Sequence, residues 1–351
     1  MADLISGIQQ VGIGVTNADE AWKWYIRHFG MDIKVFADEA RAELMKPYTG
    51  GEGHDRYAIL ALNMRGGGGF EIWEYKSRKS APPIRPFLLG DLGFNICKIN
   101  SVSVKDVCEF LQPLNPPSFT GMMNNSLGKS NAFLQDPYGN WFEIITARSK
   151  FMETNHPCGG VGGVTVGVSD MEKAIHFYSG VLGYDIIKHD ETGVFDDFKS
   201  LPGGNHTFRR VVMIAGKTRK GPFSDLLGRT EIELIQVLDR KPEKIYEGRF
   251  WGDQGFIHLC FDVNDMKGLK KHCSNLGSEF TADSSNSFDM GQAAGHFAYI
   301  EDPDGALIEF VETHRVPVVK KIGWYFRLKG RKPKPLPKWM VWALSFNRVK
   351  A

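Results

Sequence analysis

The sequence has no long apolar run, no paired-cysteine motif and no large net charge. No stretch approaches the roughly 20 apolar residues of a transmembrane helix. The chain does not open with a basic segment followed by an apolar one, so no signal peptide is expected. The five cysteines are scattered without a CxxC pair, which favours reduced thiols and a cytoplasmic protein.

Acidic residues are absent from the last part of the chain. Residues 316–351 carry ten Lys or Arg and no Asp or Glu, whereas the rest has 33 basic and 41 acidic side chains, a net charge of about −8. The body is therefore not expected to bind nucleic acid. A helix with Trp339, Trp342, Phe346 and Val349 on one side is expected to dock on the acidic body or on a second subunit, burying both tryptophans. Contact with an anionic membrane is the less favoured interpretation.

The second half of the sequence repeats the first. Three blocks recur in the same order, and such duplication must be interpreted as a repeat. The first block contains Tyr25 in one copy and Tyr178 in the other, the second is a Gly-Asp-x-Gly segment at residues 90–93 and 252–255, and the third is Asp-Pro-x-Gly followed by Glu143 or Glu309.

Each half contains two runs of one strand, one helix and further strands, identified from their apolar periodicity. The sequence therefore predicts an α+β fold of four βαβββ modules with the helices outside the sheets. Modules adjacent in sequence are expected to pair, which gives a first domain at 1–150, a second at 158–314 and a basic aromatic extension at 315–351.

Two motifs make residues 7–314 similar to the vicinal-oxygen-chelate superfamily, which includes glyoxalases, bleomycin-binding proteins and extradiol dioxygenases. They are the helix that ends in Phe177-Tyr178 and, four residues on, Leu182-Gly183, and the Asp-Pro-x-Gly turn with a glutamate four residues after the glycine, present twice. The resemblance implies that paired modules form a glyoxalase-like cup that holds a divalent metal ion.

The resemblance places four ligand positions in each half. They are Gln10, Glu71, Ile96 and Glu143 in the first half, and Gly163, Glu233, His258 and Glu309 in the second. Two carboxylates and an imidazole suit Zn, Fe, Mn, Ni or Co, and a carboxylate inside an apolar strand is costly to bury unless a cation or a partner accompanies it. We therefore expect the metal in the second half, on Glu233, His258 and Glu309, and a degenerate first site because Ile96 cannot coordinate.

This ligand set implies a metal-dependent lyase or isomerase of the glyoxalase type, acting on a small carbonyl compound that chelates through adjacent oxygens. Glu233 or Glu309 would act as the base. A lone strand histidine is, however, more often an ordinary core residue than a ligand.

Two other functions stay open. An extradiol-type dioxygenase would use Tyr299 and His296 beside the iron, but one of its histidine ligands would fall at Gly163. A metal-free protein of the bleomycin-resistance type would only bind a small molecule.

Overall fold

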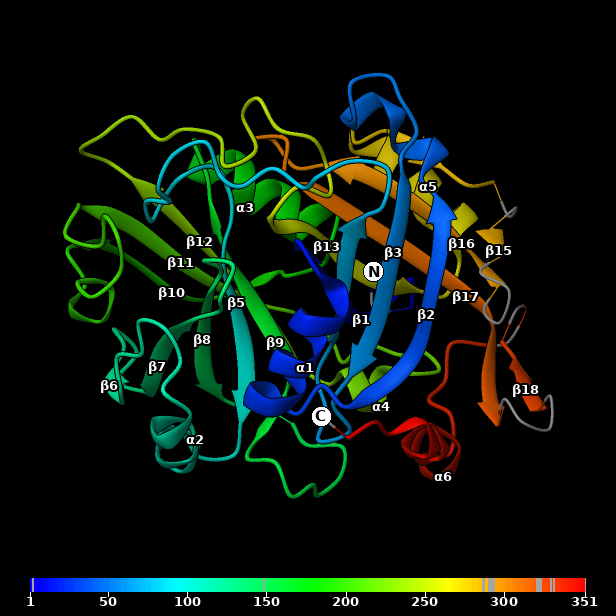
Figure 1. The fold of residues 1–351 in the computed structure, drawn as a ribbon. Helices are drawn as coiled ribbons and strands as arrows, with labels where there is room; N and C mark the ends of the chain where they lie inside the picture. Colours follow the sequence, from blue (N-terminus) through cyan, green and yellow to red (C-terminus); the bar gives the residue numbers. More distant parts are fainter. Residues whose placement is uncertain are drawn as a thin grey trace.

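A computed structural model of the chain describes residues 1, 3–147, 149–285, 288–289, 294–319, 324–328, 330 and 332–350. It confirms the α+β class and the four modules (Figure 1). None of the described helices is long and apolar enough to cross a membrane.

Each module is a strand and a helix followed by further strands. Module 1 consists of β1 (Ile5–Gly14), α1 (Ala18–Phe29), β2 (Ile33–Arg41), β3 (Asp55–Leu62) and β4 (Gly69–Tyr75). Module 2 consists of β5 (Gly93–Ser101), α2 (Val104–Leu111), β6 (Met123–Asn124), β7 (Ser130–Gln135) and β8 (Trp141–Thr146). Module 3 consists of β9 (Cys158–Gly167), α3 (Met171–Gly180), β10 (Ile186–Gly193), β11 (Phe208–Ile214), the short α4 (Ser224–Leu227) and β12 (Glu231–Val237). Module 4 consists of β13 (Gly255–Val263), α5 (Met266–Asn275), β14 (Ala282–Asp283), β15 (Phe288–Asp289), β16 (Ala294–Glu301) and β17 (Leu307–Val319).

The modules pair across the two halves of the chain. The first sheet has the order β14-β16-β17-β13-β1-β4-β3-β2, so it joins module 4 to module 1. The second sheet has the order β10-β11-β12-β9-β5-β8-β7-β6 and joins module 3 to module 2. The expected pairing of modules adjacent in sequence is therefore wrong, and neither sheet is contained within 1–150 or 158–314.

Glycines at the centre of each sheet explain why this pairing fits. A Cβ on Gly14 of β1 would lie 2.0 Å from the carbonyl oxygen of Asp253, and a Cβ on Gly167 of β9 would lie 1.9 Å from that of Asp91. Each Gly-Asp segment thus packs against the first strand of the other half. Because both halves carry the same glycines and the same Gly-Asp segment, the sequence pattern fits either pairing.

Helix α1 lies outside both cups, as expected, and packs between the two sheets on the faces opposite Glu71 and Glu143. The ring of Phe29 contacts Phe70 on β4 and Phe142 on β8, with centroids 6.1 and 4.8 Å apart. The side chain of Asn17 caps the start of this helix, and Gly30 ends it with a φ of 65°. The resulting core runs continuously between the two sheets and fixes how they pack against each other.

The extension docks on the body next to the first sheet. It contains β18 (Trp324–Arg327), α6 (Lys338–Trp342) and a 3-10 segment (Ala343–Asn347). Val341 and Leu344 are buried in a cluster with Ile33 on β2. Trp339 and Trp342, in contrast, are 56% and 44% exposed, so the expectation that both tryptophans are buried is wrong.

Candidate metal centre

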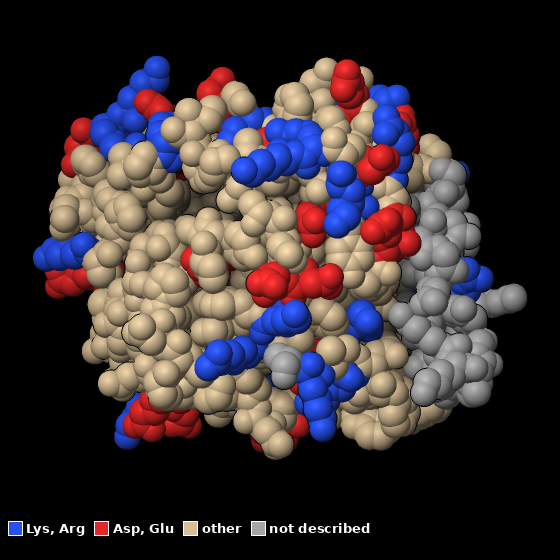
Figure 2. Space-filling model, in the orientation of Figure 1, with Lys and Arg blue, Asp and Glu red and all other residues tan. Residues whose placement is uncertain are grey.

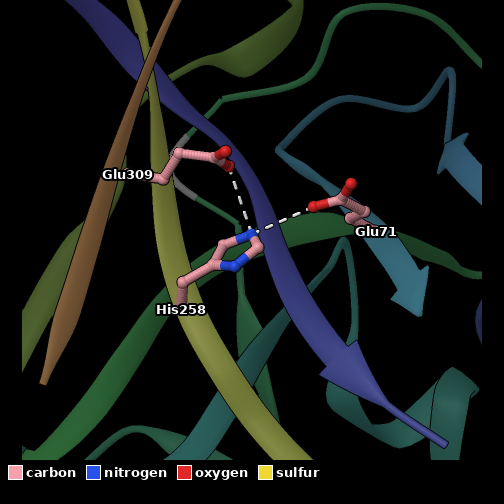
Figure 3. Close-up of side chains that lie close together, drawn as sticks. All are labelled: Glu71, His258 and Glu309. Atoms are coloured by element: carbon pink, nitrogen blue, oxygen red, sulfur yellow. Dashed lines mark ion pairs between the residues drawn. The ribbon is translucent and has the colours of Figure 1, made fainter. Parts of the chain in front are cut away.

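Three strands of the first sheet bring Glu71, His258 and Glu309 together (Figure 3). Nε2 of His258 lies 3.2 Å from Oε2 of Glu71 on β4 and 3.2 Å from Oε2 of Glu309 on β17. The three ligand atoms all lie within 4.8 Å of one another, and the three residues are buried. Two acids and an imidazole from opposite halves of the chain therefore face one point in the cup.

Gln10 on β1 is the fourth member of this cluster. Its Nε2 donates to Oε2 of Glu309 at 3.4 Å, while its Oε1 is buried and has no hydrogen-bond partner among the described residues. Amide nitrogen and oxygen are assigned from the hydrogen-bond network, and a flip of the amide would turn the oxygen toward the cluster. Gln10 and Glu71 come from module 1 and His258 and Glu309 from module 4, so the cup contains a complete set of four ligand-bearing positions.

A glycine on β1 makes room for the histidine. Gly12 pairs with both Glu71 and His258 in the sheet register. A Cβ at Gly12 would lie 2.4 Å from Cε1 of His258, a distance that no side chain could tolerate. The absence of a side chain at this position therefore allows the imidazole to lie over β1 and reach both carboxylates.

The charges in the cup shift one another's protonation. Burial alone would lower the pKa of His258, but the charge of Glu309 and the close contact with Glu71 outweigh it and raise the pKa. Burial opposes ionisation of Glu71 as well, yet His258 and Arg56 bring the pKa of Glu71 below its ordinary value. For Glu309 burial prevails, and its pKa is raised.

The residues of this cluster fit a divalent cation. Two buried carboxylates face a single imidazole, with the guanidinium of Arg56 as the further positive group near Glu71, and a buried anion is costly unless cations compensate it. His258 Nδ1 and Gln10 Oε1 have no hydrogen-bond partner among the described residues. Oxygen and imidazole donors in this combination suit Zn, Fe, Mn, Ni or Co.

A cavity of about 250 Å³ opens onto the two carboxylates. Trp73, Trp251 and Tyr299 line it, and the indole of Trp251 stacks on the ring of His258 with centroids 6.0 Å apart. The hydroxyl of Tyr299 donates to Oε1 of Glu309 at 2.7 Å. Burial, together with the charge of Glu309, raises the pKa of Tyr299 well above its ordinary value, so the phenol stays a donor.

Glu233 lies in the other sheet and does not join His258 and Glu309. Its carboxylate pairs with the buried guanidinium of Arg210, with Nζ of Lys98 at 2.8 Å and with the hydroxyl of Thr165 at 2.8 Å. Burial would raise the pKa of Glu233, but Arg210 and Lys98 lower it well below its ordinary value. The assignment of Glu233 to the same cup as His258 is therefore wrong, because module 3 pairs with module 2.

Side chains of the chain itself supply the cations of the second cup. Nζ of Lys98 lies 2.8 Å from Glu231 and 3.3 Å from Glu143, and Lys98 is only 2% exposed. In this cup Ile96 stands where His258 stands in the first cup. Ammonium and guanidinium groups thus compensate carboxylates at positions equivalent to Glu71 and Glu309.

His296 also lies apart from the cluster. Its Nε2 is 2.5 Å from Oδ1 of Asp283 on β14, and it is not among the residues that line the cavity. The sequence-based interpretation missed Glu71 and Gln10 as partners of His258. The sequence did contain a clue. Each half has at least one ligand position whose residue cannot coordinate a metal, and the other half has a possible ligand at the equivalent position.

Comparison with known proteins relates part of the chain to a family. Residues 160–310 match the sequence profile of the Glyoxalase/Bleomycin resistance protein/Dioxygenase superfamily. No protein with a curated description matches the sequence.

Solved structures share the fold of nearly the whole chain. Glyoxalase I from Zea mays is 17% identical, with 87% of this chain and 92% of that chain covered and a TM-score of 0.52. A protein provisionally assigned as a dioxygenase from Bacillus subtilis is 14% identical, with 88% and 85% covered and a TM-score of 0.56. The profile match over residues 160–310 and the shared architecture confirm the resemblance of the chain to the vicinal-oxygen-chelate superfamily and its fold.

Proposed function

We propose that this protein is a metal-dependent lyase or isomerase of the glyoxalase type. Its substrate would be a small carbonyl compound that presents two adjacent oxygens. The observation that carries the proposal is the convergence of Gln10, Glu71, His258 and Glu309 on one buried point. When bound, a divalent ion would act there as a Lewis acid that stabilises negative charge on the substrate oxygens.

Glu309 is the best candidate for moving a proton. A general base is most effective when its pKa lies near the working pH, and burial raises the pKa of Glu309 whereas Glu71 is shifted down. Tyr299 holds one oxygen of Glu309 by its 2.7 Å hydrogen bond, which leaves the other oxygen toward His258. Glu309 would thus take a proton from the carbon beside the carbonyl and return it to the neighbouring carbon.

The size and lining of the cavity favour a small substrate. The 250 Å³ cavity falls slightly below the usual range of drug-sized sites, and its aromatic lining suits a small, partly apolar compound. The cluster has a single imidazole, whereas the facial triad of iron oxygenases uses two. This composition supports the lyase or isomerase over the dioxygenase.

The test begins with protein purified without chelators. Elemental analysis should find about one equivalent of a divalent metal per chain, lost in Glu71→Gln. The protein should convert a 2-oxoaldehyde mixed with a thiol, and the activity should disappear with a chelator and return with metal. Glu143→Gln, in the second cup, is the matched control and should retain both metal and activity.

Two outcomes would overturn the proposal. Oxygen uptake with catechols, without conversion of the 2-oxoaldehyde, would identify a dioxygenase. Binding of small aromatic compounds by protein that takes up no metal would identify a binding protein.

A further inference from the structure

The docked extension leaves an aromatic face in solvent. Trp339, Trp342 and Phe346 lie at helical spacing on α6 and the 3-10 segment that follows, and they are 56%, 44% and 65% exposed. The rings of Trp342 and Phe346 contact each other edge to face at 5.2 Å. Large aromatic side chains exposed together mark an interaction surface more often than isolated ones do.

The opposite side of the same segment is fixed to the body. Val341 and Leu344 pack with Leu62 and Met64 in a buried cluster. Arg348 pairs with Asp32 at 2.9 Å, and the backbone N–H of Val349 donates to the carbonyl of Asp32 at 2.9 Å. The segment is therefore docked on the body, and its aromatic side chains are exposed because they lie on the side that faces away from the body.

Basic side chains flank these aromatic residues in the sequence. Exposed basic side chains before, within and after the helix are Lys332, Lys334, Lys338 and Lys350, and the whole extension lacks an acidic residue. Elsewhere acidic and basic side chains are interspersed, as one face of the molecule shows (Figure 2). The combination of Trp, Phe and Lys on one short segment is typical of proteins that lie on anionic lipid surfaces.

We propose that the face formed by Trp339, Trp342 and Phe346 with the neighbouring lysines binds the surface of an anionic phospholipid membrane. The rings would enter the headgroup region, where amphipathic aromatic side chains are favoured, while the ammonium groups contact lipid phosphates. A second protein fits less well. Three partly exposed rings offer on the order of 300 Å², against roughly 800 Å² per partner in a stable interface.

The experiment is co-sedimentation of the full chain with vesicles. Binding is expected to vesicles of phosphatidylcholine with phosphatidylserine and not to phosphatidylcholine alone. It should weaken between about 0.1 and 1 M salt, because the Debye length falls from about 10 to about 3 Å. Each of Lys332→Gln, Lys334→Gln and Lys338→Gln should lower partitioning roughly fivefold.

The triple variant Trp339→Ser, Trp342→Ser, Phe346→Ser should lose vesicle binding but keep the circular-dichroism spectrum of the folded protein, because Val341 and Leu344 still dock the segment. Ile84→Ser, which changes another exposed apolar residue (71%), is the control and should bind normally. The proposal is wrong if the wild-type chain does not sediment with the anionic vesicles. It is also wrong if light scattering shows a dimer that the triple variant abolishes.

Discussion

Nε2 of His258 lies 3.2 Å from Oε2 of Glu71, although the two residues belong to opposite halves of a duplicated sequence. The contact exists because module 4 joins module 1 in one sheet. It gathers the strongest candidate ligands in one cup and leaves the second cup to a lysine and an arginine.

Replacing His258 with Ala should abolish metal binding, because the cluster then loses its only imidazole. Glu71→Ala should do the same, since it removes one of two carboxylates. Glu143→Ala should leave the metal content at about one per chain, as that residue belongs to the second cup. Elemental analysis of the three purified variants checks this, and equal loss in all three would contradict the assignment.

Gly12→Ala should also lower metal binding, although Gly12 offers no ligand atom. The added methyl group would come within 2.4 Å of the His258 ring and displace it from the carboxylates. Gly193→Ala is a suitable control, because nothing lies within 4 Å of the Cβ it would add. Titration of the two metal-free variants with Zn²⁺ should give at least tenfold weaker affinity for Gly12→Ala alone; equal affinities would show that β1 can adjust.

Lys98→Met should destabilise the fold by about 3–5 kcal/mol, because it leaves buried carboxylates without their ammonium partner. Lys105→Met removes a lysine whose pair with Glu109 is exposed, and should have no measurable effect. Urea denaturation of both variants tests the contrast. A Lys98→Met variant as stable as the wild type would mean that the carboxylates of the second cup are protonated in the native state.

Asp302 should make stability depend on pH between about 4 and 6. Burial raises its pKa from 3.8 to about 6, despite hydrogen bonds from the backbone N–H groups of Ala306 and Asp304 and from the hydroxyl of Tyr178. In this window the folded state binds the proton that the unfolded state has lost, so the residue's contribution falls as pH rises. The loss amounts to on the order of 3 kcal/mol.

The variant Asp302→Asn isolates this effect. From pH 4 to pH 6 the wild type should lose free energy of unfolding relative to the variant. Urea denaturation of both proteins at each pH measures this change. A difference that stays constant over this range would show that Asp302 ionises normally in the folded protein.

Leu344→Ala should cost about 2–5 kcal/mol, because Leu344 is buried between the extension and β2. Phe346→Ala, two residues away but 65% exposed, should change stability by less than about 0.5 kcal/mol. Thermal or urea unfolding of the two variants separates docking of the extension from the role of its aromatic face. Equal effects would contradict the observed orientation of the helix.

The sequence by itself determined the local features. Duplication, apolar periodicity and the Asp-Pro-x-Gly turns specify four βαβββ modules, since these patterns depend on neighbouring residues and not on partners far along the chain. The family resemblance placed His258 and Glu309 among the inward-facing ligand positions, and the structure brings these two together.

Only the tertiary structure decided which modules share a sheet and which side of the extension faces inward. Both halves carry the same glycines and the same Gly-Asp segment where the modules meet. Local sequence therefore cannot distinguish pairing of module 1 with module 2 from pairing of module 1 with module 4. That choice separates Glu233 from His258 and supplies Glu71 in its place. For the extension, the apolar stripe of Val341 and Leu344 fits the cluster around Leu62 and Met64. The larger tryptophans are thereby left outside, because packing depends on the shape of the surface they meet as well as on hydrophobicity.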